Sequence, residues 1–345
     1  MVFVHELGHF LFAKAAGVRV DEFAIGFPPR LFGFKRGETT YTLNAILAGG
    51  YVRMLGEDDP SEPRSFAQAS RVWRILILAG GSAMNLAAAV AIFAAAHLMG
   101  WPTVTQFQVQ IVRIAANSPT EQAGVRPGDI VLRLGGQPIE RVADLSSVTR
   151  LSLGAPLRLE VRRDSAIVPL DVTPRREWPT GEGPIGVEVR ESPARVEPVA
   201  YGLAESARRG AAHTLRLTEL MVTLPVLAVR GLFPAELLRP VGPVGLFQAT
   251  SQAAAETVRS GWAYPLLALA GTLGVGLAIA NLLPIPGLDG GRLLFIALEI
   301  VRRRRVSPER EGLIHMIGMS VLLALVIVIT YFDVFSPVDL DFSLP

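Results

Sequence analysis

Three long stretches of this chain carry almost no charge, and each predicts a helix that crosses a membrane. They run over about 73–100, 262–283 and 313–332. Each can supply the roughly 20 apolar residues that a helix needs to cross about 30 Å of hydrocarbon. One such stretch is also compatible with a buried helix of a soluble protein, but three in one chain favour a membrane protein.

A fourth apolar stretch, Val2–Ala16, is too short for a full span. Only four residues precede His5, and a complete span needs about ten more upstream. We therefore expect a truncated first span, produced either by a start codon assigned too late or by trimming of the chain. No signal peptide can be read from this end.

Composition agrees with a membrane protein. Hydrophobic residues make up 50 % of the 345 residues and charged residues 19 %, whereas a soluble domain carries about 25 % charge. The net charge of +2 excludes a general polyanion-binding field. Cysteine is absent, so any metal site must use His, Asp or Glu ligands.

The distribution of Lys and Arg predicts which loops face the cytoplasm. Basic residues gather over 19–74, between the first two spans, and in the run Arg302–Arg305. Positive loops next to spans stay on the cytoplasmic side, so the region of about 102–260 faces the opposite side and both termini lie outside. An Arg run can also bind nucleic acid, but beside a span the topological interpretation is favoured, and no nucleic-acid partner is expected.

The segment His5-Glu6-Leu7-Gly8-His9 carries candidate chemistry. Two histidines four residues apart lie on one side of a helix, about 6 Å apart along its axis, a spacing that suits two imidazoles on one Zn²⁺. Glu6 then lies beside the metal without binding it, placed to take a proton from water as in His-Glu-x-x-His metalloproteases. Chance occurrence of the pattern is the alternative.

A second polar element interrupts the third predicted span. The segment 281–292 contains two prolines followed by Asp289-Gly290-Gly291. Broken backbone near membrane depth is tolerated only where it is buried in protein or lines a polar cavity. Asp289 is therefore a candidate third zinc ligand, which leaves one position open for water. The alternative is that Asp289 only turns the chain or caps a helix over 291–301.

The region between the second and third spans predicts a small α+β domain over 103–192. Its pattern is a strand, a short helix, a Gly-Asp turn at Gly128-Asp129, a strand, a Gly-Gly turn, a helix over 142–151 and a strand pair, and Pro184–Val187 closes the sheet. This pattern resembles a bacterial PDZ domain, a fold that takes a peptide as an added strand. The alternatives are that the domain filters substrates by size, or that it is a small β domain without a peptide ligand.

The segment 193–260 predicts a linker followed by amphipathic helices. Pro193–Pro198 has the composition of a linker. The helical spacing over 199–232, interrupted by Glu219 and Arg230, predicts a pair of amphipathic surface helices, and a fifth span is the less favoured alternative. A tight turn is expected over 241–245.

Taken together, these motifs resemble the site-2 protease family, in particular its bacterial regulator-of-sigma-E type. Other matching stretches are Phe23–Phe27, Leu47–Met54 and Gly80-Gly81-Ser82-Ala83-Met84-Asn85, in which Ser82 stands where the family has proline. This chain has one PDZ-like module where the best-known enterobacterial type has two.

The resemblance implies a zinc-dependent intramembrane endopeptidase in the bacterial inner membrane. It implies Zn²⁺ bound by His5, His9 and Asp289, with Glu6 as the general base. It also implies a β-hairpin over about 20–55 that dips into the membrane from the cytoplasmic side and helps to hold the substrate. Expected substrates are single-span membrane proteins, such as anti-sigma factors after a first extracytoplasmic cut, or remnant signal peptides. Candidate substrate contacts are Asn281, Asn85, Gly49 and Gly50.

The sequence thus predicts a polytopic α-helical membrane protein with about four transmembrane helices, the first one truncated. The protease core is split into 1–101 and 261–345, with an extracytoplasmic PDZ domain inserted between them. Three alternatives remain open: a soluble-type zincin with Glu22 as third ligand, a transporter with broken helices, which would show repeated halves, and a non-catalytic membrane scaffold that presents its PDZ domain.

Overall fold

The computed structural model describes residues 1–57, 61–232, 240–304 and 306–336. The chain forms two compact units. We call the first the helical unit; it contains Met1–Trp101 and the described residues between 200 and 336. The second, the β-domain, contains Pro102–Val199. In the order of the chain, the β-domain is inserted into the helical unit.

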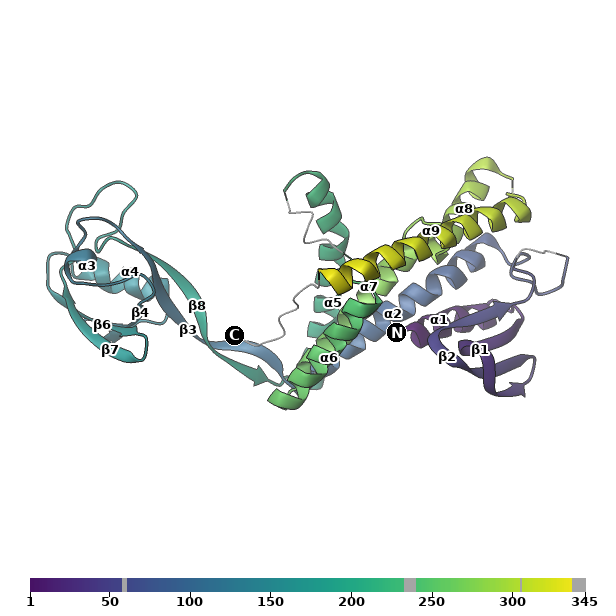
Figure 1. The fold of residues 1–345 in the computed structure, drawn as a ribbon, viewed down its shortest axis with the longest axis horizontal. Helices are drawn as coiled ribbons and strands as arrows, with labels where there is room; N and C mark the ends of the chain where they lie inside the picture. The colour runs from purple at the N-terminus through teal and green to yellow at the C-terminus, as the bar shows by residue number, and fades with distance from the viewer. Residues whose placement is uncertain (58–60, 233–239, 305, 337–345) are drawn as a thin grey trace. The chain divides into compact units, whose positions relative to one another are not determined.

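The helical unit is built from seven helices among the described residues (Figure 1). These are α1 (Val2–Ala15), α2 (Arg71–Met99), α5 (Leu203–Val229), α6 (Pro243–Ser260), α7 (Tyr264–Leu282), α8 (Asp289–Arg302) and α9 (Pro308–Phe335). By length and composition, α2, α5, α7 and α9 can each cross a membrane. Helices α2, α7 and α9 occupy the three stretches that the hydrophobic pattern predicted as spans.

Close helix packing in this unit depends on small residues. Helices α1 and α7 both pack against α2. A Cβ added at Gly8 on α1 would overlap the carbonyl of Gly80 on α2, so the two backbones are in direct contact. Such small-residue contacts replace the missing hydrophobic driving force between helices in lipid. Phe93 on α2 is fully buried and fills the space against Val275 of α7.

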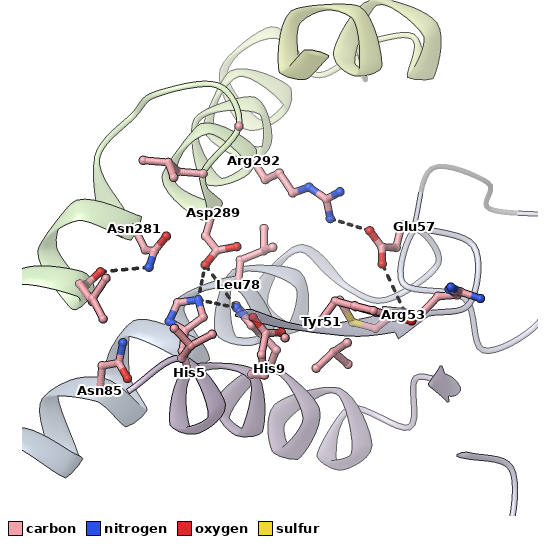
Figure 2. Close-up of a pocket in the computed structure, with 18 residues that line it drawn as sticks. His5, His9, Tyr51, Arg53, Glu57, Leu78, Asn85, Asn281, Asp289 and Arg292 are labelled. Atoms are coloured by element: carbon pink, nitrogen blue, oxygen red, sulfur yellow. Dashed lines mark hydrogen bonds and ion pairs between the residues drawn. The ribbon is translucent and has the colours of Figure 1, made fainter. Parts of the chain in front are cut away.

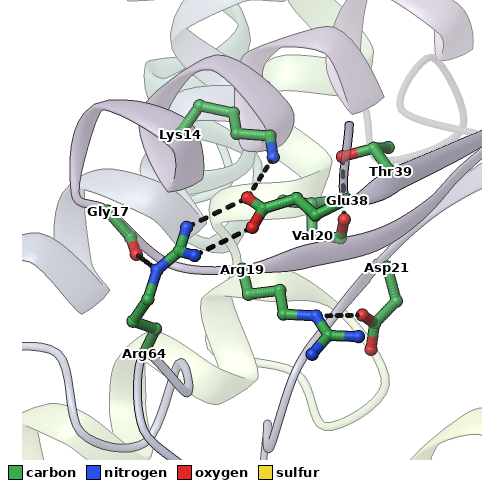
Figure 3. Close-up of polar contacts among 8 residues, drawn as sticks. All are labelled: Lys14, Gly17, Arg19, Val20, Asp21, Glu38, Thr39 and Arg64. Atoms are coloured by element: carbon green, nitrogen blue, oxygen red, sulfur yellow. Dashed lines mark hydrogen bonds and ion pairs between the residues drawn. The ribbon is translucent and has the colours of Figure 1, made fainter. Parts of the chain in front are cut away.

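A two-stranded antiparallel hairpin follows α1, as the family resemblance implied. It consists of β1 (Val20–Arg36) and β2 (Thr39–Met54), joined at Gly37-Glu38. Figure 3 shows how its turn is fixed: the Glu38 carboxylate accepts hydrogen bonds from Lys14 at 2.7 Å and from Arg64 at 2.8 and 3.0 Å. Hydrogen bonds from Arg64, then from Lys14, lower the pKa of Glu38 to about 2. This ion pair ties the hairpin turn to the end of α1.

The β-domain contains the strands and helices expected over 103–192. They are β3 (Trp101–Ile114), α3 (Pro119–Gln122), β4 (Ile130–Leu134), β5 (Gln137–Pro138), α4 (Val142–Leu151), β6 (Leu157–Arg163), β7 (Ala166–Val172) and β8 (Val187–Val199). The sheet order is β7-β6-β4-β3-β8, with β5 paired to β4. Val109, Leu134, Leu159 and Val161 are among the residues that form its buried core.

Two expectations over 193–232 are wrong. Pro193–Pro198 is not a linker but the second half of strand β8. Proline is tolerated there because β8 lies at the edge of the sheet, where no further strand needs its N–H. The residues expected to form a helix pair form one helix, α5, because Glu219 lies on its exposed face and does not interrupt it.

Candidate metal centre

Three side chains from two distant segments converge at one point of the helical unit. His5 and His9 lie on α1, and Asp289 is the first residue of α8 (Figure 2). Their facing atoms form a triangle: His5 Nε2 lies 3.0 Å from Asp289 Oδ2 and 3.0 Å from His9 Nε2, and His9 Nε2 lies 3.2 Å from Asp289 Oδ2. Tetrahedral zinc with bonds of about 2.0–2.2 Å needs ligand atoms roughly 3.3 Å apart. The triangle therefore has the size of a zinc site.

The tautomer of His9 also suits a metal ligand. Its Nδ1 donates a hydrogen bond to the carbonyl oxygen of Ile77 on α2 at 2.8 Å, which places the proton on Nδ1 and leaves the Nε2 lone pair for a metal. Both imidazoles are buried, with 7 % of His5 and 6 % of His9 exposed. Two Nε2 atoms and a carboxylate oxygen that face one another are a donor set for a metal cation.

Glu6 lies between the metal-site residues and strand β2. Val52 of β2 and Glu6 both line the cavity described below. A Cβ added at Gly50 would lie 3.2 Å from Glu6 Cγ, so the glycine leaves room for this side chain. Glu6 lines the same cavity as His5, His9 and Asp289.

Gly81 on α2 is a site residue that sequence reasoning did not single out. A Cβ at this position would lie 2.6 Å from His5 Cε1, 2.6 Å from His9 Nε2 and 2.7 Å from His5 Nε2. The space for the two imidazoles thus exists only because residue 81 has no side chain. The signal in the sequence was the pair Gly80-Gly81 inside an apolar helix, where glycine costs about 1 kcal/mol and so indicates a packing reason.

The three side chains open onto a cavity of about 550 Å³. Of the candidate substrate contacts, Asn85, Asn281 and Gly50 line this cavity, and Gly49 is not among the lining residues. Instead, a Cβ at Gly49 would overlap the ring of Phe27 on β1.

The two asparagines differ in their hydrogen bonds. The side-chain amide N–H of Asn281 donates a hydrogen bond to the carbonyl oxygen of Leu277 on the same helix, at 3.0 Å. Asn85 is fully buried, and neither of its amide atoms has a hydrogen-bond partner among the described residues. A buried amide without partners is costly, so Asn85 calls for a structural or functional explanation.

Charged side chains form the polar wall of the cavity. Arg292 on α8 donates to Glu57 at 2.7 Å, and Arg53 also lines the cavity (Figure 2). Glu22, the alternative third ligand, lies elsewhere: its carboxylate accepts hydrogen bonds from Arg30 and Thr42, both at 3.0 Å. The soluble-zincin alternative therefore loses its candidate ligand.

Fold and site together define a membrane protein with a candidate metal centre, formed by a His-Glu-x-x-His helix and a distant aspartate. Comparison with known proteins agrees. The profile of peptidase family M50 matches residues 1–325. The chain therefore belongs to peptidase family M50, the site-2 protease family, and this membership confirms the family and the zinc metallopeptidase class predicted from the sequence.

Several relatives match over nearly their whole length. A candidate zinc metalloprotease of Clostridium perfringens is 32 % identical over 98 % of this chain and 96 % of its own. The zinc metalloprotease RasP of Oceanobacillus iheyensis is 29 % identical over 97 % of this chain and 96 % of its own. The regulator of sigma-W protease RasP of Bacillus subtilis is 27 % identical over 97 % of this chain and 95 % of its own.

Among solved structures, the PDZ domain of an SdrC-like protein from Listeria monocytogenes matches with 14 % identity and a TM-score of 0.23. The match covers 25 % of this chain and 92 % of that domain. A similarity of this size carries no argument about function.

Proposed function

We propose that this protein is a zinc-dependent intramembrane endopeptidase in which His5, His9 and Asp289 hold the metal and Glu6 is the general base. The observation that carries the proposal is the triangle of ligand atoms with edges of 3.0–3.2 Å beside Glu6. The zinc named in the relatives fits this donor set. When bound, it supplies Lewis acidity that polarises a peptide carbonyl and activates water.

The residues of the chain supply the proton transfers and the geometry. The Glu6 carboxylate, which lines the cavity beside the three ligands, accepts the proton of the attacking water and returns it to the leaving amine nitrogen. Hydrogen bonding of His9 Nδ1 to Ile77 keeps its Nε2 aimed at the metal position. The Asn85 amide offers an unused donor to the carbonyl oxygen of the extended substrate.

The substrate class follows from the site's surroundings. The centre lies among helices that can cross a membrane, so the bond to be cleaved belongs to a transmembrane segment. Such a segment must unwind, because a peptide carbonyl in a helix is already hydrogen-bonded. Strand β2 borders the cavity at Gly50–Met54 and can pair with the extended segment. We propose single-span proteins of the bacterial inner membrane as substrates, including trimmed anti-sigma factors and remnant signal peptides.

We also propose that the β-domain lies on the extracytoplasmic side. The Lys/Arg distribution supports this placement. Binding of a peptide and filtering of substrates by size are both compatible with its fold, and each stays a prediction.

The first test separates chemistry from metal binding. Glu6→Gln keeps the shape of the side chain but cannot accept a proton, so cleavage of a single-span substrate should fall by at least about 10²-fold while zinc content stays unchanged. Asp289→Ala should lose most of the zinc. Wild-type cleavage by Glu6→Gln contradicts the role of Glu6, and full zinc retention by Asp289→Ala contradicts the ligand set.

A further inference from the structure

The segment that delivers Asp289 to the metal site is not helical. Helix α7 ends at Leu282, and the chain passes through Pro284, Pro286 and Gly287 before α8 begins at Asp289. Gly287 has a φ of +101°, a conformation that favours glycine. The position of Asp289 therefore depends on whatever fixes this short connection.

Helix α9 packs directly against this connection. The backbone N–H of Gly287 donates a hydrogen bond to Nδ1 of His315 on α9, at 2.9 Å. A Cβ added at Gly318 would overlap the carbonyl of Pro286, and one added at Gly287 would lie 3.1 Å from the backbone nitrogen of Met319. The last helix thus contacts the connection by one side-chain hydrogen bond and by close backbone packing.

The imidazole of His315 is itself held in place. Its ring centroid lies 5.4 Å from that of Phe295 on α8, and 18 % of its side chain is exposed. Since Nδ1 accepts the hydrogen bond, the proton of the neutral ring is on Nε2, which lies 4.0 Å from Glu311 Oε1 one helical turn earlier. His315 therefore bridges α9, the connection and α8.

We propose that His315 is a positioning residue for the metal centre: its Nδ1 lone pair fixes the Gly287 peptide and thereby holds Asp289 against His5 and His9. The inference rests on the proposed function, in which Asp289 is the third zinc ligand. His315 does not touch the metal or the substrate. Residues that orient ligands in this way commonly change metal affinity by about 10- to 100-fold when they are lost.

The test compares variants that keep or remove the acceptor. His315→Asn places an amide oxygen near the position of Nδ1, whereas His315→Leu fills the space without an acceptor. His315→Phe keeps the ring contact with Phe295 without an acceptor, and it carries the test if His315→Leu does not fold. Met316→Leu is the control, since Met316 on the same helix is 61 % exposed.

Each full-length variant is purified in detergent, its helical content is compared by circular dichroism, and zinc release to a chromophoric chelator is followed. We expect His315→Leu and His315→Phe to release zinc about 10- to 100-fold more readily than the wild type. His315→Asn and Met316→Leu should stay within about 3-fold of it.

Two results overturn the inference. In the first, a folded His315→Leu or His315→Phe variant holds zinc as tightly as the wild type. In the second, His315→Asn releases zinc as readily as His315→Leu and His315→Phe do. Asp289→Ala in the same assay separates this failure from failure of the proposed function. If Asp289→Ala also retains its zinc, the ligand set is wrong; if it loses zinc while His315→Leu does not, only the role of His315 is wrong.

Discussion

At the scale of single residues, the proposed metal centre depends on the missing side chain of Gly81 as much as on the proposed ligands. Gly81 lies on α2, while the imidazoles it faces come from α1, so its importance arises only when the two helices pack. A methyl group at 2.6–2.7 Å from three imidazole atoms cannot be accommodated without moving a histidine.

Gly81→Ala should therefore displace the ligands. A misplacement of about 1 Å can cost 10²-fold in rate, and we expect a loss of cleavage of that order together with a lower zinc content. Gly276→Ala on α7 is the matched control, because a Cβ there meets nothing within 4 Å. Equal activity of the two variants would show that α1 and α2 are further apart than the structure has them.

Asn85 gives a second prediction at this scale. Both of its buried amide atoms lack partners among the described residues, so removing them costs the folded state no hydrogen bond. Asn85→Leu should keep or raise the melting temperature while it lowers kcat/KM for a single-span substrate by about 10-fold or more. A variant that loses stability and activity in proportion would indicate a structural role.

At the scale of elements, the sequence predicted what depends on local pattern. His5, Glu6 and His9 stand at helical spacing, and Asp289 follows two prolines that must break a helix, so both halves of the site were visible before their contact was known. Three features were not predicted: the role of Gly81, the hydrogen bond between Gly287 and His315, and the position of Gly49 away from the cavity. Each depends on helices or strands that meet in space, and spacing along the chain does not reveal such contacts. The second half of strand β8 was missed because its prolines give it the composition of a linker. An edge position in a sheet tolerates such prolines.

The Gly128-Asp129 turn should make a pH-dependent contribution to the folding stability of the β-domain. Burial alone would raise the pKa of Asp129, but hydrogen bonds from Arg163 at 2.8 Å and from the Arg126 N–H at 2.9 Å outweigh it, and the pKa is lowered from its usual 3.8. A lowered folded-state pKa contributes stability that is present above the unfolded value and is lost as the pH falls through the folded value.

Replacing Asp129 should therefore act mainly at neutral pH. Asp129→Asn leaves Arg163 without its charged partner, and we expect the β-domain to lose about 1–3 kcal/mol at pH 7. The difference from the wild type should shrink below about pH 4. Limited proteolysis of the full-length protein at pH 7 and pH 3 measures it, and a difference that grows in acid would contradict the assigned ion pair.

At the scale of the whole molecule, packing inside the helical unit restricts how the chain crosses the membrane. Near the start of α2, Arg74 bonds Glu299 of α8 at 2.8 Å. After its end, the Trp101 ring lies 4.9 Å from that of Tyr264 at the start of α7. Since α2 and the α7–α8 pair thus run antiparallel, the chain from 100 to 263 must cross the membrane an even number of times.

The even number of crossings limits what α5 can do, although α5 is long and apolar enough to cross the membrane. If α5 crossed, a return crossing would have to follow. The Gly245 N–H at the start of α6 bonds Asp333 near the end of α9, at 2.8 Å. Helix α9 passes the metal-site connection at His315, and Asp333 lies 18 residues further on, about 27 Å along a helix. We therefore expect the start of α6 to lie on the same side of the membrane as the end of α2. Residues 231–241 are fewer than the roughly 20 that a helical crossing needs.

We therefore expect α5 to begin and end on the side from which the chain leaves for the β-domain. The chain contains no cysteine, so single cysteines report their side without background. Ser147→Cys in the β-domain and Arg230→Cys at the end of α5 should react with a membrane-impermeant maleimide from the same side of sealed vesicles. Ser307→Cys, before α9, should react only from the other side. Reaction of Arg230→Cys together with Ser307→Cys would make α5 a complete span and would contradict the expected side of the start of α6.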